Sequence, residues 1–379
     1  MTGARFAVIS GGGTGGHVFC ALAIARSLRA LGHEPQTIEL VGSRRGQEAL
    51  LLAGEGFPFT LLPGRGLVRR LDAASLRANL GAAAGLLGAA LREIVDLARR
   101  RPRVVVSVGG YASFPADLAA VVLGVPLVLV TVDAVPGAVH RLFARRAAAN
   151  AVAFEGTALP RAVVTGVAVR EEIARVDRSP EAMARALKEL ELPEGRGVVG
   201  VVGGSLGARR VNVAAVGLAA RWRGRGDRAL YHVTGRREAE RVRRDASERG
   251  LLGADGGLCY RMVDFENRMP RLYEAVDVMV CRAGASTVAE LAVAGVPSVL
   301  VPLPGAPGDH QHANARALEE AGAALVVADA DCDADRLGAL LDELLGDPGR
   351  LREMGEAARA LGRPDAADRI GELVVAHAR

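Results

Sequence analysis

The chain has 379 residues, which exceeds the usual length of one domain. Of these residues 50% are hydrophobic and 24% are charged, a composition that excludes a disordered protein. The 48 basic residues outnumber the 43 acidic ones, and the net charge of +5 fits an anionic ligand or a weak preference for an anionic membrane surface. Aromatic residues make up only 3% of the chain. This is too few for the stacking surfaces that bind single-stranded nucleic acid, so we expect no nucleic-acid partner.

The cysteines and the apolar segments exclude further classes of protein. Cys20, Cys259, Cys281 and Cys332 lie far apart and show neither a zinc-ligand spacing nor a disulfide framework. No apolar window reaches the ~20 residues of a membrane span, and the N-terminus shows no signal-peptide pattern. We therefore expect a cytoplasmic protein.

Short aliphatic strands alternate with helical segments, such as Val18–Ala30 and Ala73–Arg99, along the whole chain. The expected strands form two series: Phe6–Ser10, Thr37–Leu40, Phe59–Leu62, Val104–Val108, Leu127–Val132 and Ala151–Phe154, then Val198–Val202, Leu230–Val233, Tyr260–Val263, Val278–Cys281, Ser298–Val301 and Leu325–Val327. This alternation is typical of α/β proteins with doubly wound parallel sheets.

Two series of strands predict two Rossmann-like domains. A charged segment with two prolines, Val163–Arg196, separates them. We place the N-terminal domain at residues 1–165 and the C-terminal domain at 166–379, and the last helix could pack back on the N-terminal domain. In such folds ligands bind beyond the C-terminal ends of the strands. The loops at those ends, on two domains facing each other across a cleft, are therefore the places to search for a site.

The first such loop, Gly11–His17, follows the first strand and opens the first helix. Glycines let the backbone approach a ligand closely, and free N–H groups at a helix N-terminus attract an anion. The letters also match the dinucleotide pattern G-x-G-x-x-G, with Glu39 at the end of the second strand as a ribose partner. A tight turn without a ligand is the alternative, although it does not require five glycines in six residues.

Two further glycine loops follow strands. Gly109–Pro115 comes after the fourth strand, at the same edge of the first sheet. Gly203–Arg209 repeats the strand, loop and helix arrangement in the second series, where Ser205 and backbone N–H groups could hold a phosphate. A dehydrogenase has no need for this second loop.

Two helices of the second series carry candidate sugar and ribose ligands. A turn of small residues at Cys281–Glu290 opens one helix, and Glu290 could accept two hydrogen bonds from a ribose diol, or it could be a surface residue. Gln311 and Asn314 are three residues apart on one helix face, and amides suit sugar hydroxyls. His310 and His312 diverge on a helix, so no metal pair is expected there.

Two other patterns have alternative interpretations. The acidic segment Asp329–Asp335 could bind a metal, but we favour helix capping because the helical stretch Arg336–Leu345 follows. The arginine-rich segment Leu67–Arg77 and the apolar run Leu80–Leu91 could lie on an anionic membrane surface or form a core helix.

Together, Gly12–His17, Gly109–Pro115, Gly203–Arg209, Cys281–Glu290 and His310–Asn314 resemble the signature loops of the MurG family of peptidoglycan N-acetylglucosaminyltransferases, in the same order and over nearly the whole chain. The resemblance implies the GT-B architecture and no metal or other cofactor. It also implies a UDP-N-acetylglucosamine donor bound by the C-terminal domain. The acceptor would be a lipid-linked diphosphate bound by the N-terminal domain, with the protein peripheral at the inner face of the cell membrane.

The resemblance also implies roles for individual residues. On the donor side it implies contacts with the diphosphate, the ribose, the uracil-reading loop and the sugar hydroxyls from Arg170, Ser205, Phe265, Glu266, Ala285, Glu290, Gln311 and Asn314. On the acceptor side it implies a diphosphate cradle and neighbouring contacts from Thr14, Gly15, Gly16, Tyr111 and Thr131.

The sequence departs from the family at the acceptor side. Where the family carries His-Glu-x-Asn after the fifth strand, this chain has Val130, Thr131, Val132 and Asp133. An inverting transfer needs a base for the acceptor hydroxyl. We expect His17 to be this catalytic residue, with Asp133 second, because a histidine needs little pKa tuning near pH 7.

Five functions remain open at this point. The first is transfer of N-acetylglucosamine to form lipid II. The second is a MurG-like glycosyltransferase of an antibiotic pathway with another diphosphate acceptor or UDP-sugar, which the altered residues 130–133 favour. A catalytically inactive nucleotide-sugar-binding protein, a nicotinamide-dependent oxidoreductase and a UDP-sugar 2-epimerase are the others.

Overall fold

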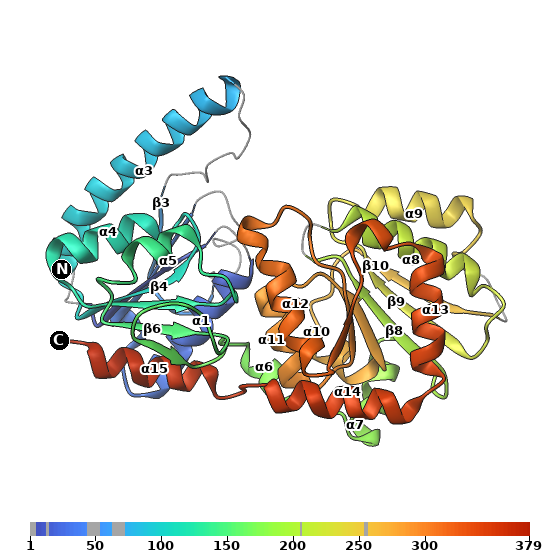
Figure 1. The fold of residues 1–379 in the computed structure, drawn as a ribbon. Helices are drawn as coiled ribbons and strands as arrows, with labels where there is room; N and C mark the ends of the chain where they lie inside the picture. Colours follow the sequence, from blue (N-terminus) through green and yellow to red (C-terminus); the bar gives the residue numbers. More distant parts are fainter. Residues whose placement is uncertain (1–4, 13–14, 44–53, 63–72, 205–206, 254–256) are drawn as a thin grey trace. The chain divides into compact units, whose positions relative to one another are not determined.

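The computed structural model describes residues 5–12, 15–43, 54–62, 73–204, 207–253 and 257–379, and it divides into two compact units (Figure 1). The first unit contains residues 1–170 and 364–379, and the second contains residues 171–363. Each unit is built on one parallel β-sheet, of seven strands in the first and six in the second. The α/β fold class with two doubly wound parallel sheets is therefore confirmed.

The sheet of the first unit has the strand order β3-β2-β1-β4-β5-β6-β7. Its strands are β1 (Ala7–Gly11), β2 (Ile38–Ser43), β3 (Phe59–Leu62), β4 (Val104–Gly109), β5 (Leu127–Thr131), β6 (Ala149–Val152) and β7 (Ala162–Val164). Its helices are α1 (Gly15–Ala30), α3 (Ala73–Arg100), α4 (Phe114–Leu123), α5 (Ala138–Phe143) and α15 (Ala366–His377), with a short 3₁₀ turn at Pro35–Thr37. The central strands are rich in valine and buried on both faces, as a covered parallel sheet requires.

The C-terminal helix α15 belongs to the first unit and packs against α1. A hydrogen bond of 3.1 Å joins Ser27 Oγ to Asp368 Oδ1. The two helices approach so closely that a Cβ on Gly371 would lie 2.5 Å from the Ser27 hydroxyl. The chain end thus completes one layer of helices, while α3 and α4 pack together in another.

The sheet of the second unit has the strand order β10-β9-β8-β11-β12-β13. Its strands are β8 (Gly197–Val202), β9 (Arg228–Val233), β10 (Cys259–Val263), β11 (Val278–Cys281), β12 (Ser298–Leu300) and β13 (Ala324–Val326). Its helices are α6 (Glu171–Ala174), α7 (Pro180–Glu189), α8 (Arg209–Arg221), α9 (Ala239–Glu248), α10 (Met269–Ala275), α11 (Ala285–Ala294), α12 (His310–Glu320), α13 (Ala334–Leu345) and α14 (Pro348–Leu361), with 3₁₀ turns at Pro307–Asp309 and Asp329–Asp331.

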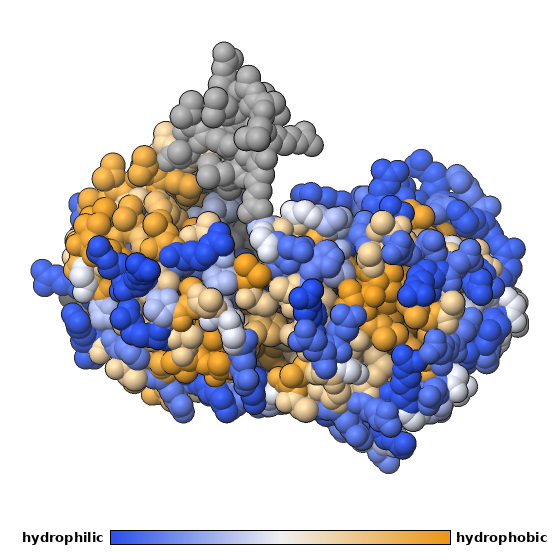
Figure 2. All heavy atoms as spheres, viewed as in Figure 1, coloured by the Kyte–Doolittle hydropathy of each residue, from blue (hydrophilic) through white to orange (hydrophobic). Residues whose placement is uncertain are grey.

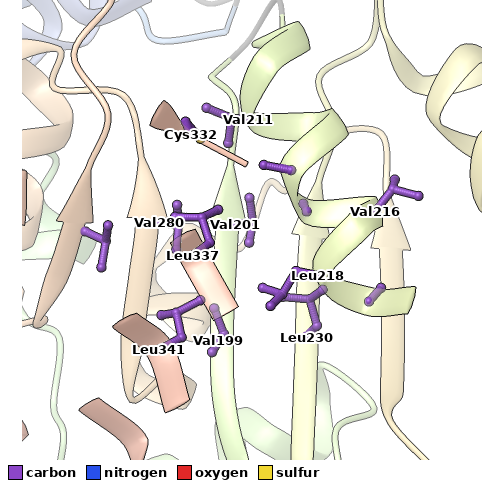
Figure 3. Packing of buried hydrophobic residues seen from close by; sticks show 14 of the residues in the cluster. Val199, Val201, Val211, Val216, Leu218, Leu230, Val280, Cys332, Leu337 and Leu341 are labelled. Carbon is purple, nitrogen blue, oxygen red and sulfur yellow. The ribbon is translucent and has the colours of Figure 1, made fainter. Parts of the chain in front are cut away.

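The core of the second unit lies between helices α8 and α13 and the middle strands of the sheet (Figure 3). Val211 and Leu218 of α8 and Leu337 of α13 meet Val199 and Val280 of the strands, and all five side chains are fully buried. This packing fixes the strand ends from which the candidate site loops start.

The observed strands differ from the predicted ones at two places in the first unit. Strand β6 covers Ala149–Val152, two residues earlier than predicted. Strand β7 was not predicted, because it has only three residues and an exposed edge position gives no apolar pattern.

The acidic segment before α13 acts as predicted. The side chain of Asp333 accepts a hydrogen bond of 2.8 Å from the backbone N–H of Arg336 and so caps the helix. Asp329 pairs with Arg282 at 2.6 Å.

All four cysteines are free thiols. Among the described residues, no helix combines the length and the apolarity needed to cross a membrane.

Candidate active site

In the first unit, the loops after β1 and β4 touch each other at glycines. Gly110 has a φ of 81°, and a Cβ there would lie 2.5 Å from the carbonyl oxygen of Gly12. Gly109 has a φ of 100°, and its Cβ would lie 3.1 Å from the imidazole of His140. Both positions therefore require glycine, for backbone conformation and for space.

His17 lies beside this contact, half-buried in the first turn of α1. Its Nδ1 is 3.7 Å from the position that a Cβ on Gly110 would take. Gly15 and Gly16 start the same helix and are partly exposed, whereas Thr14 lies outside the described residues. The structure thus brings His17 to the crossing of the two glycine loops, at the C-terminal edge of the sheet.

The other expected acceptor residues lie at the same edge. Tyr111 lies in the loop after β4, and its hydroxyl is 3.0 Å from Ser43 Oγ at the end of β2. Thr131 ends β5 and is buried, and Asp133 is half-buried two residues later. Arg170, the last residue of this part of the unit, stacks over the ring of Phe19 on α1 at 4.7 Å.

A buried polar cluster under these loops was not predicted from the sequence. Asp117 of α4, Ser107 of β4, His140 of α5 and Thr131 form one line of contacts. Ser107 is the one polar side chain of its strand and Asp117 that of its helix, so the available signal was a single polar residue in an apolar element. His140 gave no such signal, because Arg141 is next to it in α5. Such a residue needs a buried partner, but sequence alone does not name the partner.

In the second unit, the loop after β8 is held tightly against its surroundings. A Cβ on Gly203 would lie 2.7 Å from the backbone nitrogen of Ala208, and one on Gly207 would lie 2.5 Å from the carbonyl oxygen of Thr234. Gly207 also has a φ of 85°. Ser205, the expected diphosphate ligand, lies outside the described residues.

A second buried polar cluster supports this loop. Asn212 of α8 donates from Nδ2 to the carbonyl oxygen of Thr234 at 2.9 Å, and its Oδ1 is 3.0 Å from His232 Nε2. The other ring nitrogen of His232 is 2.9 Å from the hydroxyl of Tyr260. Burial lowers the pKa of His232 to about 3, so its imidazole is neutral.

The loop after β10 carries Phe265 and Glu266. The guanidinium of Arg236 lies 4.4 Å from the ring centroid of Phe265. Glu266 is buried, and its carboxylate accepts from the hydroxyl of Tyr231 and from the backbone N–H of Arg268, the latter at 2.6 Å. Its side chain therefore shapes the loop from inside.

Glu290 lies in the second turn of α11, which begins at the buried residue Ala285. The hydroxyl of Tyr273 donates to Glu290 Oε2 at 2.8 Å and so fixes the position of the carboxylate. Burial raises the pKa of the Cys281 thiol to about 12, and the negative charge of Glu290 adds to the rise. Glu290 therefore lies close to the end of β11.

The two amides of α12 both bond to loops of the same edge. Asn314 is buried and donates to the carbonyl oxygen of Ala283, in the loop that opens α11. Gln311 Oε1 accepts from the backbone N–H of Leu303, in the loop that precedes α12. Both side chains thus hold the loops on either side of Glu290.

The dinucleotide interpretation of the first glycine loop fails at its acidic residue. Glu39 is buried, and its carboxylate accepts from Thr60 Oγ1 at 2.8 Å and from Arg5 Nε at 3.1 Å. A ribose would have to displace these partners.

Across the part of the chain that the structure describes, no group of three or more histidine, cysteine or acidic side chains is placed to hold a metal ion.

Two family models match the chain in the order of its two units. The glycosyltransferase family 28 N-terminal domain matches residues 7–152, and the glycosyltransferase family 28 C-terminal domain matches residues 198–370. The chain belongs to glycosyltransferase family 28.

Individual relatives cover the chain almost completely. The UDP-N-acetylglucosamine--N-acetylmuramyl-(pentapeptide) pyrophosphoryl-undecaprenol N-acetylglucosamine transferase of Halorhodospira halophila is 40% identical, over 98% of this chain and 99% of its own length. The protein of the same name from Clavibacter michiganensis is also 40% identical, over 97% and 95% of the two chains. The MurG-family resemblance is therefore confirmed, and the protein is a glycosyltransferase.

Solved structures agree with this assignment. The crystal structure of Acinetobacter baumannii MurG matches with a TM-score of 0.75 and 27% identity, over 98% of this chain and 99% of that one. The glycosyltransferase of kitacinnamycin matches with a TM-score of 0.70 and 19% identity over 99% of both chains, and this likeness shows the fold alone. The GT-B architecture is thus confirmed.

Proposed function

We propose that this family 28 enzyme transfers N-acetylglucosamine from UDP-N-acetylglucosamine to a hydroxyl of a lipid-linked diphosphate, the step that forms lipid II. The observation that carries the proposal is the 40% identity, over nearly the whole of both chains, with transferases of that name. The geometry of both units supports it, because each presents a glycine loop at a helix N-terminus, which suits a diphosphate.

On the donor side, we assign Glu290 to the ribose hydroxyls and the loop Gly203–Arg209, with Ser205, to the diphosphate. Support for Glu290 comes from its anchored carboxylate, which Tyr273 holds through one oxygen. The inward-facing carboxylate of Glu266 supports recognition of uracil by the backbone around Phe265.

Two amide side chains, Gln311 and Asn314, hold loops on the donor side. We assign Gln311 and Asn314 to the sugar end of the donor, where they act at least in part by fixing the loops at Leu303 and Ala283. Ala285 begins the helix that carries Glu290. We also assign Arg170 to the nucleotide, as the resemblance implies.

In the transfer step, the acceptor oxygen attacks the anomeric carbon as the bond to the UDP oxygen breaks, and the leaving electron pair goes to the diphosphate. Preorganised backbone N–H groups stabilise that charge. We assign His17 as the base that takes the proton of the acceptor hydroxyl, since it lies at the crossing of the two glycine loops. Asp133 is the second choice, and Gly15, Gly16, Thr14, Tyr111 and Thr131 would line the acceptor.

A contact with the membrane surface is part of the proposal. Along α3, Leu87, Leu91 and Val95 recur every four residues and are exposed, with Leu91 at 68%. Figure 2 shows apolar residues gathered on this face of the first unit. Exposed Arg141 and Arg145, on and just after α5, suit anionic head groups. We therefore place the enzyme peripherally on the inner face of the cell membrane.

A second acceptor class is favoured by one observation. Thr131 and Asp133 stand where the family carries a carboxylate and an amide, so the acceptor pocket differs in chemistry from that of the family. The second candidate is thus the same transfer to another diphosphate acceptor, such as one in an antibiotic pathway.

The test is UDP release from UDP-N-acetylglucosamine with and without a lipid I analogue, together with calorimetric binding of UDP and NAD. We expect UDP release that depends on the analogue, and binding of UDP but not of NAD. Tight UDP binding without turnover on the analogue would favour the second acceptor class. Binding of NAD without UDP would contradict the proposal.

A further inference from the structure

We propose that Asp117, Ser107 and His140 are positioning residues for the transfer, because they form one directed chain of hydrogen bonds that ends on the hydroxyl of Thr131 under the acceptor loops. The proposal rests on the proposed glycosyl transfer, since the chain acts through the loops that carry His17 and Asp133. None of the three was singled out by the sequence.

The direction of the chain follows from its end groups. A carboxylate can only accept, so Ser107 Oγ donates its single proton to Asp117 Oδ2, at 2.8 Å. Ser107 must then accept from His140 Nε2, which lies 3.2 Å away.

The remaining ring nitrogen completes the chain. Burial lowers the pKa of His140 to about 3, with the nearby His17 as the second cause, so the imidazole is neutral and carries one proton. With that proton on Nε2, His140 Nδ1 accepts from Thr131 Oγ1 at 2.8 Å. The hydroxyl of Thr131 thereby has a fixed orientation, and its oxygen is left as an acceptor.

The chain starts at a carboxylate surrounded by hydroxyls. Ser10 of β1 lies 3.3 Å from Asp117 Oδ1, and Ser113 lies 3.1 Å from Asp117 Oδ2. Burial raises the pKa of Asp117 to about 7, against the opposing effect of the three serine hydrogen bonds. The titratable groups connected with it are His140 on α5 and, behind that, His17 on α1.

His140 and Ser113, which both belong to this hydrogen-bond network, also contact the acceptor loops. Ser113 Oγ has a single proton and lies 3.1 Å from each of two acceptors, the carbonyl oxygen of Gly110 and Asp117 Oδ2. The imidazole of His140 packs against Gly109. Gly110 in turn meets Gly12 and His17. At the other end, Thr131 is the last residue of β5, from which the loop with Asp133 begins. The chain of hydrogen bonds therefore contacts the loops that carry both candidate bases, His17 and Asp133.

Protonation of Asp117 breaks this direction. A neutral carboxyl group donates a proton, so Ser107 no longer has to give its own to Asp117 and can offer it to His140 instead. The tautomer of His140 and the orientation of Thr131 are then no longer fixed. The ordered chain therefore belongs to the pH range above about 7.

Ser107→Ala and Ser10→Ala are a matched pair of variants for the test. Both serines are fully buried on neighbouring strands and bond to Asp117, but only Ser107 connects Asp117 with His140. We expect Ser107→Ala to lower kcat by about 10-fold to 100-fold, with the KM for the UDP-sugar unchanged. Ser10→Ala should leave kcat close to the wild-type value when both are measured well above pH 7, where Asp117 is ionised in both proteins. Equal effects of the two changes, or no effect of either, would overturn the proposal.

Two further readouts separate positioning from general destabilisation. The acid limb of the kcat profile should lie near pH 7 in the wild type, and its midpoint should move in Asp117→Asn, where Asp117 no longer titrates. Thr131→Val should lower kcat, while Thr131→Ser, which keeps the hydroxyl, should restore it. An acid limb with the same midpoint in Asp117→Asn as in the wild type, or full activity of Thr131→Val, would contradict the proposal.

Nitrogen-15 NMR of the histidines tests the chain without any acceptor. At about pH 8, above the pKa of Asp117, we expect His140 to carry its proton on Nε2 in the wild type and to lose this fixed tautomer in Ser107→Ala. The opposite tautomer in the wild type would overturn the directed chain. A wild type with the expected tautomer but no transfer to a lipid I analogue would contradict the proposed acceptor and leave the directed chain supported.

Discussion

The two units support their glycine loops with buried histidine clusters of different chemistry. In the second unit, the Asn212 amide donates to a backbone carbonyl, so its oxygen faces His232 and puts the proton of that ring on Nε2. Tyr260 then donates to Nδ1. In the first unit, His140 has the same tautomer, but a carboxylate, Asp117, sets it.

Because of this difference, we expect only the cluster of the first unit to change its hydrogen bonds with pH. The ring nitrogens of His232 bond to Asn212 and Tyr260, which both stay neutral near pH 7, so these hydrogen bonds keep one arrangement there. The cluster around His140 depends on the charge of Asp117, whose pKa burial raises to about 7. We therefore expect changes in the second unit to alter donor affinity, and changes in the first unit to alter kcat and its pH dependence.

The largest effect is expected for Gly110→Ala. The new Cβ would lie 2.5 Å from the Gly12 carbonyl oxygen at a φ of 81°, so the two acceptor loops must separate. Displacement on this scale lowers kcat by about 100-fold or more, with UDP affinity unchanged. Gly85→Ala in α3, where nothing lies within 4 Å, is the control. Steady-state kinetics and UDP titration measure both, and loss of UDP binding in Gly110→Ala would break the comparison.

The matching change on the donor side is Glu290→Ala. Removing a carboxylate that bonds a ribose diol should weaken UDP binding by about 10-fold to 100-fold, the loss of one charged hydrogen-bonding group. Tyr273→Phe, which removes only the hydroxyl that anchors the carboxylate, should have a smaller effect. Calorimetry with UDP measures both variants. Wild-type affinity in Glu290→Ala would remove the ribose assignment.

Asp117→Asn separates stability from turnover. The folded-state pKa of Asp117 is raised from 3.8 to about 7, so its contribution to stability is full below about pH 4 and is lost as the pH rises through about 7. The variant lacks this loss, so above about pH 7 its free energy of unfolding should exceed that of the wild type, on the order of 1–3 kcal/mol.

Urea unfolding between about pH 5 and pH 8 measures this difference for the two proteins. We expect the stability of the wild type to fall relative to that of Asp117→Asn across this range, while kcat is lower in the variant. A pH-independent difference between the two proteins would show that Asp117 does not titrate there.

The smallest effect is expected for Tyr260→Phe in the second unit. The change removes the hydrogen bond to His232, which is worth about 1 kcal/mol of stability. UDP affinity should fall slightly, and the pH profile of kcat should keep its shape. A shifted acid limb in this variant would mean that the second cluster also titrates in the reaction.

The glycine loops could be predicted from the sequence, because a positive φ or a close backbone contact restricts a position to glycine locally. Gly110 and Gly207 show this requirement directly. Strand β7 was missed because three exposed residues carry no apolar period. The dinucleotide pattern offered a ribose role for Glu39 that the structure does not support, since Arg5 and Thr60 hold its carboxylate and nothing local in the sequence reveals these partners.

The cluster around His140 could not be predicted, for a different reason. Its members come from α4, α5, β4 and β5, and only the sheet order brings them together. The sequence did show that Val130–Asp133 lack the imidazole and the carboxylate of the family motif. The structure places an imidazole next to Thr131 and links it to a carboxylate through Ser107, which is a long-range fact of the fold.

The most direct test of the proposed reaction is the mass of the acceptor after incubation with UDP-N-acetylglucosamine. The account predicts that a lipid-linked diphosphate sugar gains one N-acetylhexosamine, with one UDP released per product. Gly110→Ala should slow this gain by about 100-fold or more while still binding UDP. An unchanged acceptor mass with active, folded wild-type protein would contradict the assignment of a lipid-linked diphosphate as its acceptor.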